Sequence, residues 1–445
     1  MSHTEHSIPL PEDPLADRHK LGWGLAALVV AGNMIGSGLY LLPVSLASTG
    51  SSSLIGWLVA AVGAVMLALV FGALGRVAPK ADGLSGFAEK GLGRFAGFQV
   101  SLAFWMACLV GNVAVAVAAT GYLGFFWPAL KDPVAATLCN LGLIWVATGA
   151  YIIGARTASW LAAAALVIGL IPIVIAVAAG VTAFSPDVFV ASWSPSDEPL
   201  LKTVPASLAI IFWAYLGVES AAALSHRVRH PATDVRRASV AGALLATVVY
   251  VAATVAVFGV IPVEQLADST SPYADLAGRV FGASIAGVVA VCAIAKTLGT
   301  IGGWTMMGGE TARAAAQQGY LPSGFGSSTK TPIVTPLLGA AFMSVIAVLS
   351  GQPTLGGQFA ILVGVTSVLT LSIYAVCSLS LFRMARTPGA RVIAVLGLLF
   401  AVAAVAAAAP GYILPTVGFV ALMTVAWFLF LRKSGSRVDP EDQGA

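Results

Sequence analysis

The sequence predicts an all-α membrane protein with twelve transmembrane helices. Two observations support this prediction. Of the 445 residues, 58% are hydrophobic and only 9% are charged, with a mean hydropathy of +0.92, whereas about 25% of the residues of a soluble domain are charged. The apolar residues also gather in runs of about 20, the length that crosses a bilayer. We therefore expect one transmembrane domain, residues 21–432, between short tails at 1–20 and 433–445.

Twelve apolar runs joined by short polar segments are the expected spans. They lie near 22–48, 54–76, 95–124, 133–153, 157–184, 203–225, 238–262, 281–314, 334–351, 357–384, 391–408 and 411–431. Loops rich in Lys and Arg face the cytoplasm. With the N-terminus inside, all 23 basic residues fall in inside segments except Lys131, Lys202, Arg279 and the intramembrane Lys296. We expect a multi-pass protein of the cell inner membrane with both termini in the cytoplasm.

The composition also argues against several functions. The net charge of +4 comes from basic residues in short loops, so no nucleic-acid partner is expected. No zinc, phosphate-loop or nucleophile-elbow pattern is present. His226 and His230 are four residues apart, but they lie among arginines that repel a cation. The four cysteines lie in apolar segments and are expected to be buried free thiols. We expect no catalytic residue, no metal and no cofactor.

The first span contains the most informative segment, GNMIGSG at residues 32–38. Asn33, Gly36, Ser37 and Gly38 would break a helix at membrane depth, where lipid cannot satisfy free backbone groups. Such a break must be buried in protein or line a cavity. The N–H groups around it, with the Ser37 hydroxyl, favour a carboxylate site. Close helix packing through small residues is the structural alternative.

The third span carries FWMACLVGN, in which Ala107 and Asn112 flank a turn and Cys108 lies between them. An Asn in a span usually faces protein because its amide needs partners. The pattern leaves open whether Asn112 binds a substrate or makes a structural hydrogen bond to another helix.

The sixth span, with FWAYLGVES, is interrupted at Gly217. Trp213 lies beside this break and could cover a substrate, although an interfacial position is the usual role of Trp. Glu219 must be paired or hydrated in a membrane. Interruptions five spans apart suggest two inverted repeats of five helices, with spans eleven and twelve appended.

The eighth span contains Lys296, the one lysine expected inside the membrane. Lys296, Thr300 and Trp304 are four residues apart and so share a helix face. Trp304 could stack on a cation. Lys296 near mid-span has little opportunity to reach an interface, so we expect a functional role for it.

Taken together, the chain resembles the basic amino acid/polyamine antiporters of the amino acid–polyamine–organocation superfamily, and is most similar to the arginine/agmatine antiporters. The resemblance runs from about residue 21 to 432. It is carried by GNMIGSGLYLLPVSLASTG, FWMACLVGN, GYLGFFWPALKDP, GLIPIV, FWAYLGVES and IGGWTMMGGETARAAAQQGYLP. It implies the twelve-span, inverted-repeat (LeuT-like) fold and exchange of an external amino acid for its decarboxylated amine by alternating access.

The resemblance also assigns roles to residues. Asn33 and Ser37, with the backbone at Ile35, Gly36 and Gly38, would hold the amino and carboxylate groups. The guanidinium end would meet the third span and Trp304, and Trp213 would form a lid. The implied distal contacts are Ala107, Cys108, Asn112 and Thr366, and the implied outer gate is Phe104, Glu219 and Tyr374.

Two residues depart from the family pattern. Phe104 lacks the hydroxyl of the family's tyrosine, so we expect a differently bonded gate. Lys296 stands where the arginine antiporters have a small residue, and it would repel a cationic substrate placed close to it. We expect Lys296 to be mainly charged and to substitute for a bound cation between spans one and eight, giving it, with Glu219, a role in coupling.

These residues leave two transport functions open. The first is exchange of a cationic, arginine-like amino acid for its amine, and the alternative is proton-coupled amino acid uptake using Lys296. A receptor or scaffold lacks support because no soluble domain is evident. The expected partners are the small substrates and the lipid bilayer, and a homodimer stays open as an assembly.

Overall fold

The computed structural model describes residues 22–154, 164–165, 167–196, 198–220, 228, 231–322, 325 and 333–431. The predicted tails and the two histidines of the loop after span six lie outside these residues. Every element of the described part is a helix. Among them are eight apolar helices long enough to cross a membrane and four shorter apolar ones. These twelve helices match the twelve predicted spans one for one.

The spans follow one another along the chain with short connections. They are α1 (Trp23–Met34), α3 (Ser53–Val77), α5 (Arg94–Leu123), α6 (Pro133–Ile153), α8 (Ile171–Ala183), α10 (Leu200–Phe212), α12 (Pro231–Phe258), α15 (Ala283–Gln317), α16 (Val334–Leu349), α17 (Leu355–Met384), α18 (Pro388–Ala407) and α19 (Pro410–Ala426).

Short helices that the sequence did not predict fill the connections and the breaks. They are α2 (Leu42–Ser45), α4 (Gly83–Leu92), α9 (Pro186–Ala191), α13 (Val263–Ala267), α14 (Pro272–Phe281), the 3-10 turns η2 (Ser37–Tyr40), η3 (Gly50–Ser52), η4 (Pro128–Lys131) and η5 (Trp213–Tyr215), and the π turn η8 (Trp427–Leu431).

Local sequence signals set several helix starts. Asp132 caps α6 by accepting hydrogen bonds from the N–H groups of Val134 and Ala135, at 3.0 and 2.9 Å. Thr354 and Thr387 cap α17 and α18 in the same way. α6 and α18 also begin with proline, which fits the first turn because its missing N–H would have no partner there.

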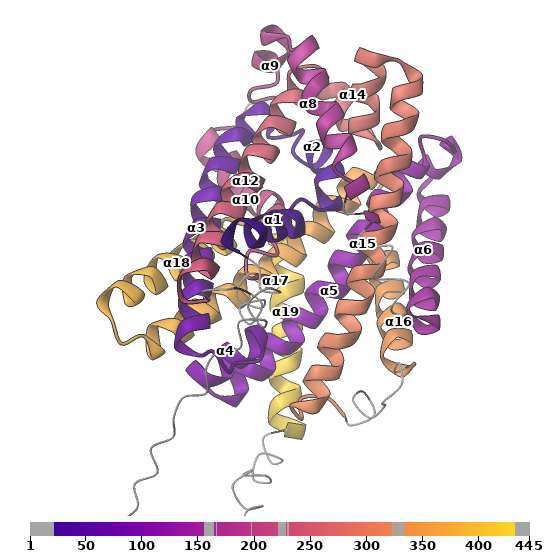
Figure 1. Ribbon diagram of the computed structural model, residues 1–445. Helices are drawn as coiled ribbons and strands as arrows, with labels where there is room; N and C mark the ends of the chain where they lie inside the picture. The colour runs from indigo at the N-terminus through magenta and orange to yellow at the C-terminus, as the bar shows by residue number, and fades with distance from the viewer. Residues whose placement is uncertain are drawn as a thin grey trace, which may run out of the picture.

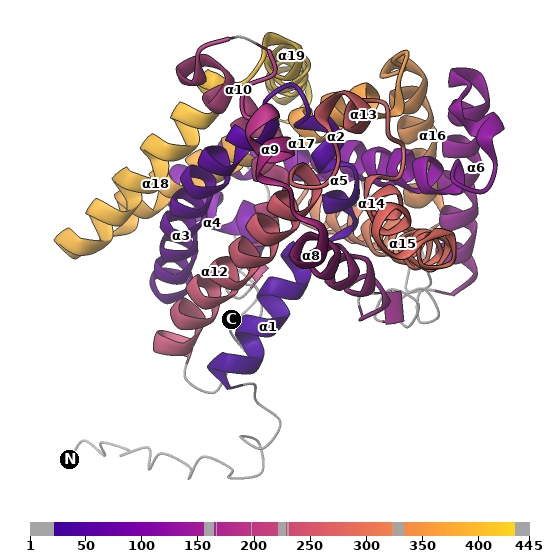
Figure 2. The ribbon, with the colours of Figure 1, turned by 90° about the horizontal axis from the view of Figure 1, so that it is seen from above.

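The spans differ in how deeply they are buried in the protein. The most apolar window of α5 is 89% buried and that of α17 is 72% buried, against 22% for α18 and 6% for α19. α15 and α17 both pack on α5, and α1 packs on α12. Figures 1 and 2 show α5 inside the bundle and α18 at its edge beside α3. This arrangement fits a ten-helix core with α18 and α19 appended.

The two ends of the bundle can be told apart by their connecting helices. α4 lies at one end, which we call the α4 side, and α2, α9 and α14 lie at the other (Figure 1). The end of α17 belongs to the α4 side, because a Cβ at Gly91 of α4 would lie 2.5 Å from Cβ of Ser380. Three of the four free cysteines are buried as expected, whereas Cys139 is half-buried.

Candidate functional site

Both predicted helix breaks are present. α1 ends at Met34, Gly36 has extended backbone, and a new 3-10 turn begins at Ser37. α10 ends at Phe212 and continues as η5. The chain then turns through Leu216, which is extended, and Gly217, whose φ of 105° is accessible mainly to glycine. The sequence prediction of two interrupted spans is confirmed.

The break in α1 leaves specific backbone groups without a partner inside a helix. The N–H of Gly36 donates to the carbonyl of Met34 at 2.6 Å, so this N–H is already used. Ser37 and Gly38 are the first two residues of η2, and the N–H groups at a helix start have no acceptor within it. These two groups are therefore the carboxylate donors that the break can supply. The side chain of Ser37 lies outside what the structure describes.

Trp213 connects the two breaks. A Cβ at Gly38 would lie only 1.7 Å from Nε1 of Trp213, so the indole rests directly on the broken segment of α1. The ring centroids of Trp213 and Trp304 are 5.4 Å apart, with 34° between the ring planes. Both rings also lie against Gly111 of α5, where a Cβ would come within 2.4 Å of Trp304 and 3.0 Å of Trp213. Two glycines thus make room for a pair of indoles at the centre of the bundle.

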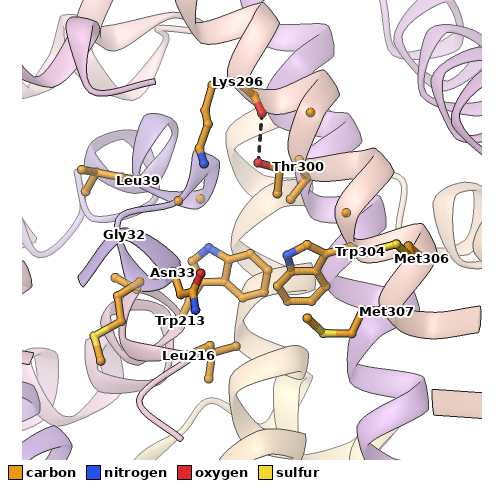
Figure 3. Close-up of a pocket in the computed structure, with 17 residues that line it drawn as sticks. Gly32, Asn33, Leu39, Trp213, Leu216, Lys296, Thr300, Trp304, Met306 and Met307 are labelled. Carbon is orange, nitrogen blue, oxygen red and sulfur yellow. Dashed lines mark hydrogen bonds between the residues drawn. The ribbon is translucent and has the colours of Figure 1, made fainter. Parts of the chain in front are cut away.

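A cavity of about 360 Å³ lies between the breaks, α5 and α15. This volume lies within the usual range for small-molecule sites, about 300–1,000 Å³. Figure 3 shows Trp213, Trp304, Asn33 and Lys296 around it. Its wall consists of Gly32, Asn33, Met34, Gly36, Gly38, Leu39, Val115, Trp213, Ala214, Leu216, Lys296, Gly299, Thr300, Gly303, Trp304, Met306 and Met307.

Lys296 is the one charged side chain among the described residues of this wall. It is 7% exposed, and it extends from α15 toward the break between α1 and η2, near Leu39 (Figure 3). Its stem lies against Gly169 of span five, where a Cβ would come within 2.5 Å of its Cγ. The carbonyl of Gly169 in turn accepts a 2.7 Å hydrogen bond from Tyr40. These contacts direct the terminal nitrogen of Lys296 toward the helix break.

The structure brings six of the predicted site residues onto the cavity wall and leaves others off it. The six are Asn33, Gly36, Gly38, Trp213, Lys296 and Trp304. Ile35 is buried beside the break. The predicted distal contacts lie elsewhere: Ala107 and Cys108 are buried, and the fully buried hydroxyl of Thr366 donates to the carbonyl of Leu362 at 2.8 Å.

Asn112 does not line the cavity, and its side chain contacts other protein side chains. Its amide nitrogen donates to Oγ1 of Thr305 at 2.9 Å and lies 3.5 Å from Sδ of Met343. The side chain is 1% exposed. The structure thus shows the hydrogen bond between helices, one of the two roles that the sequence left open. The expected contact of Asn112 with a substrate stays a prediction.

Two of the three residues expected to form a gate are hydrogen-bonded to each other. The hydroxyl of Tyr374 donates to Oε2 of Glu219, which also accepts a 3.2 Å hydrogen bond from the N–H of Gly217. Phe104 is half-buried in the core and has no hydroxyl to join them. Tyr374 precedes Cys377 by one turn, and Sγ of Cys377 lies 3.8 Å from the carbonyl of Leu84 in α4.

The Glu219–Tyr374 bond therefore lies on the α4 side of the cavity, and this position brings two of the sequence predictions into conflict. The basic residues of α4 and its neighbours led us to expect that side in the cytoplasm. A cytoplasmic α4 side and an outer gate at Glu219 cannot both hold.

Sequence reasoning missed part of the wall. Gly299, Gly303 and Met307 lie three, seven and eleven residues after Lys296, on the same face of α15, so helical periodicity could have found them. Leu39 and Val115 carry no such signal, because only the packing of α1 and α5 around the cavity brings them there. Among the described residues, no three His, Cys, Asp or Glu side chains gather in a way that could hold a metal ion.

The fold and the cavity define the class of this protein. A multi-pass helical bundle with a small-molecule cavity between two broken helices is the architecture of secondary transporters. The chain belongs to the amino acid permease family, whose model matches residues 21–437.

Curated relatives point the same way. The chain is 32% identical to the putrescine transporter PotE of Escherichia coli K12, over 81% of this chain and 82% of the relative. It is 32% identical to the cadaverine/lysine antiporter of the same strain, over 83% and 84%. The PotE of Haemophilus influenzae is 28% identical over 81% and 83%. The family and these relatives are transport proteins, not enzymes.

Proposed function

We propose that this chain exchanges a cationic amino acid for its decarboxylated amine by alternating access. The observation that carries the proposal is the cavity between the two helix breaks, with Trp213 and Trp304 in its wall. The relatives' names, a putrescine transporter and a cadaverine/lysine antiporter, support an amino acid and an amine as the two substrates. The sequence resemblance favours arginine and agmatine as the pair.

The cavity offers different contacts to the two ends of an amino acid. The N–H groups of Ser37 and Gly38 would bind the carboxylate, as helix starts bind anions. Trp304 would stack on the cationic end of the side chain. Trp304 follows Lys296 by eight residues, which is about 12 Å along a helix. The ammonium of Lys296 therefore lies toward the carboxylate end and away from the cationic end.

The amine lacks the carboxylate and would depend more on Trp304. We place the protein in the cell inner membrane with the α4 side facing the cytoplasm, following the distribution of basic residues. In this orientation, breaking the Glu219–Tyr374 bond would open the cavity to the amine inside the cell.

Counterflow in proteoliposomes tests this proposal. Vesicles containing the protein are loaded with unlabelled agmatine, cadaverine, putrescine, arginine or lysine, and uptake of labelled arginine or lysine is followed. We expect uptake that requires an internal substrate and is supported by a matching amine. Equal uptake into empty and loaded vesicles would contradict exchange, and the internal substrate that supports the fastest uptake identifies the pair.

Proton-coupled uptake is the second candidate, and one observation favours it. Lys296 is a buried ammonium in the cavity wall, and no Asp or Glu lies among the described residues of that wall. Such a group could gain and lose a proton during the cycle. Accumulation into empty vesicles driven by a pH gradient alone would support this function over exchange.

A further inference from the structure

A second hollow lies on the α4 side of the bundle, away from the central cavity. Its volume is about 1,080 Å³, and it is bounded by the end of α3 and by the joint between α17 and α18. Four arginines line it: Arg76, Arg383, Arg386 and Arg391. We call this hollow the arginine basin. The arginine basin shares no lining residue with the central cavity, so its role does not rest on the proposed function.

Arg383, Arg386 and Arg391 bring three positive charges to one hollow, and Arg76, which has an interaction of its own, borders them. No Asp or Glu is found among its described lining residues. Arg391 is held in the joint by a 3.2 Å hydrogen bond from its Nε to the carbonyl of Ala385. This bond uses one of the five N–H groups of the guanidinium and leaves the others for a ligand. Cationic groups brought together in this way attract an anion from the surroundings.

Apolar side chains border the basin on the lipid-facing surface. Val77 follows Arg76 in the sequence, Phe382 precedes Arg383, and Val392 follows Arg391. These three apolar side chains are 42%, 42% and 58% exposed. α18 continues this surface with Leu396 and Leu399, which are 42% and 60% exposed. In a membrane protein, such a surface faces acyl chains, so the arginines lie where apolar surface meets the headgroup layer.

We propose that the arginine basin binds the phosphate group of an anionic phospholipid, with the acyl chains lying along α3 and α18. One guanidinium group can donate two parallel hydrogen bonds to two oxygens of a phosphate group, so arginine suits this ligand. Basic pockets on the cytoplasmic side of membrane proteins recognise anionic headgroups. The exposed apolar border favours a lipid over free phosphate, because only a lipid has acyl chains that can pack against this border.

Native mass spectrometry of the full chain tests the proposal with phosphatidylglycerol and phosphatidylcholine as probes. The test variant combines Arg386→Gln with Arg391→Gln. The matched control combines Arg236→Gln with Arg237→Gln, which removes two exposed arginines of α12 that do not line the basin. We expect the test variant to weaken phosphatidylglycerol binding by about thirtyfold, the effect of two arginines at an anionic surface. The control should bind like the wild type.

Further measurements separate lipid binding from a general charge effect and from binding of free phosphate. A variant with Arg386→Lys and Arg391→Lys keeps the charge and should retain part of the binding, whether or not the glutamine variant folds. Equal losses in the test and control variants would show a general charge effect and overturn the proposal. Equal binding of phosphatidylcholine would also overturn it. Displacement of phosphatidylglycerol by millimolar inorganic phosphate would assign the basin to free phosphate instead.

Discussion

At the scale of single residues, Trp304 is the side chain on which the binding model depends most. It lines the cavity, and its ring lies beside that of Trp213, with 5.4 Å between the ring centroids. Replacing Trp304 with Leu removes a cation–π contact worth about 0.5–2 kcal/mol. We expect the affinity for the cationic amino acid to fall severalfold to about thirtyfold, as measured by binding in detergent.

A second tryptophan provides the control for this substitution. Trp127 is 60% exposed and does not line the cavity. Trp127→Leu should leave the affinity unchanged. Normal binding by Trp304→Leu would remove the stacking contact from the model.

For Asn112, we expect a substitution to affect the stability of the protein more than substrate binding. Because its amide bonds to Thr305 of α15, Asn112→Ala removes a contact between two spans. Such a hydrogen bond contributes about 0.5–1.5 kcal/mol. We expect a lower unfolding temperature and equal effects on long and short amino acid substrates. A loss confined to substrates with a distal donor would instead place Asn112 in the binding site.

At the scale of elements, the break after α1 depends on a glycine, because only a residue without a side chain leaves room for Trp213 at position 38. Gly38→Ala would place a methyl group 1.7 Å from Nε1 of Trp213, so the indole would have to move out of the site. A displacement of about 1 Å can lower activity about 100-fold. We expect exchange by Gly38→Ala to fall by at least tenfold while the protein still inserts in the membrane.

Gly24, also in α1, is the matched control. A Cβ at Gly24 would meet nothing within 4 Å. Gly24→Ala should exchange substrate at the wild-type rate. If Gly38→Ala did so too, contact between the break and Trp213 would be irrelevant to transport.

Lys296 extends from α15 toward the break after α1, and these elements would move relative to each other during alternating access. We predict that its charge matters mainly for this step. Lys296→Met keeps the volume and removes the charge. It should slow exchange by about tenfold, which corresponds to about 1.4 kcal/mol in the barrier, and change the binding affinity much less. Measuring the exchange rate and the binding affinity on the same preparation, for Lys296→Met and for the wild type, tests this prediction. A normal rate and pH profile would make Lys296 a passive residue.

The sequence predicted the elements better than the contacts between them. The breaks at Gly36 and Gly217 were predictable because glycine stabilises a helix poorly, and each lies beside polar residues at membrane depth. The shared face of Lys296, Thr300 and Trp304 followed from helical periodicity. The partner of Asn112 did not, because periodicity gives a direction around one helix and not the neighbour in that direction. Thr305 and Met343 are about 200 residues away in the chain.

The pair Glu219 and Tyr374 also shows that the sequence does not identify contacts between helices. The sequence places Glu219 just after the break of span six, but it does not say toward which end of the cavity the carboxylate points. That direction follows from the bond to Tyr374 in α17 and from the contact of α17 with α4. The structure therefore pairs two of the three residues predicted for the gate, and their position conflicts with an outer gate in the predicted orientation.

At the scale of the whole molecule, we propose that the substrate occupies the cavity between the two helix breaks during exchange. Thr300 lines this cavity and Ser196 lies exposed between α9 and α10. Each can be replaced with Cys in a variant whose four native cysteines have been substituted and whose exchange activity is retained. The two sites then report on the cavity and on the outer surface of the same protein.

The most direct measurement is the rate at which a water-soluble thiol reagent labels these two cysteines, with and without saturating substrate. We expect that the transported amino acid and amine each slow labelling of Thr300→Cys, and that neither changes labelling of Ser196→Cys. Unchanged labelling of Thr300→Cys by a substrate that the same variant exchanges would contradict the account, because the substrate would then bind elsewhere.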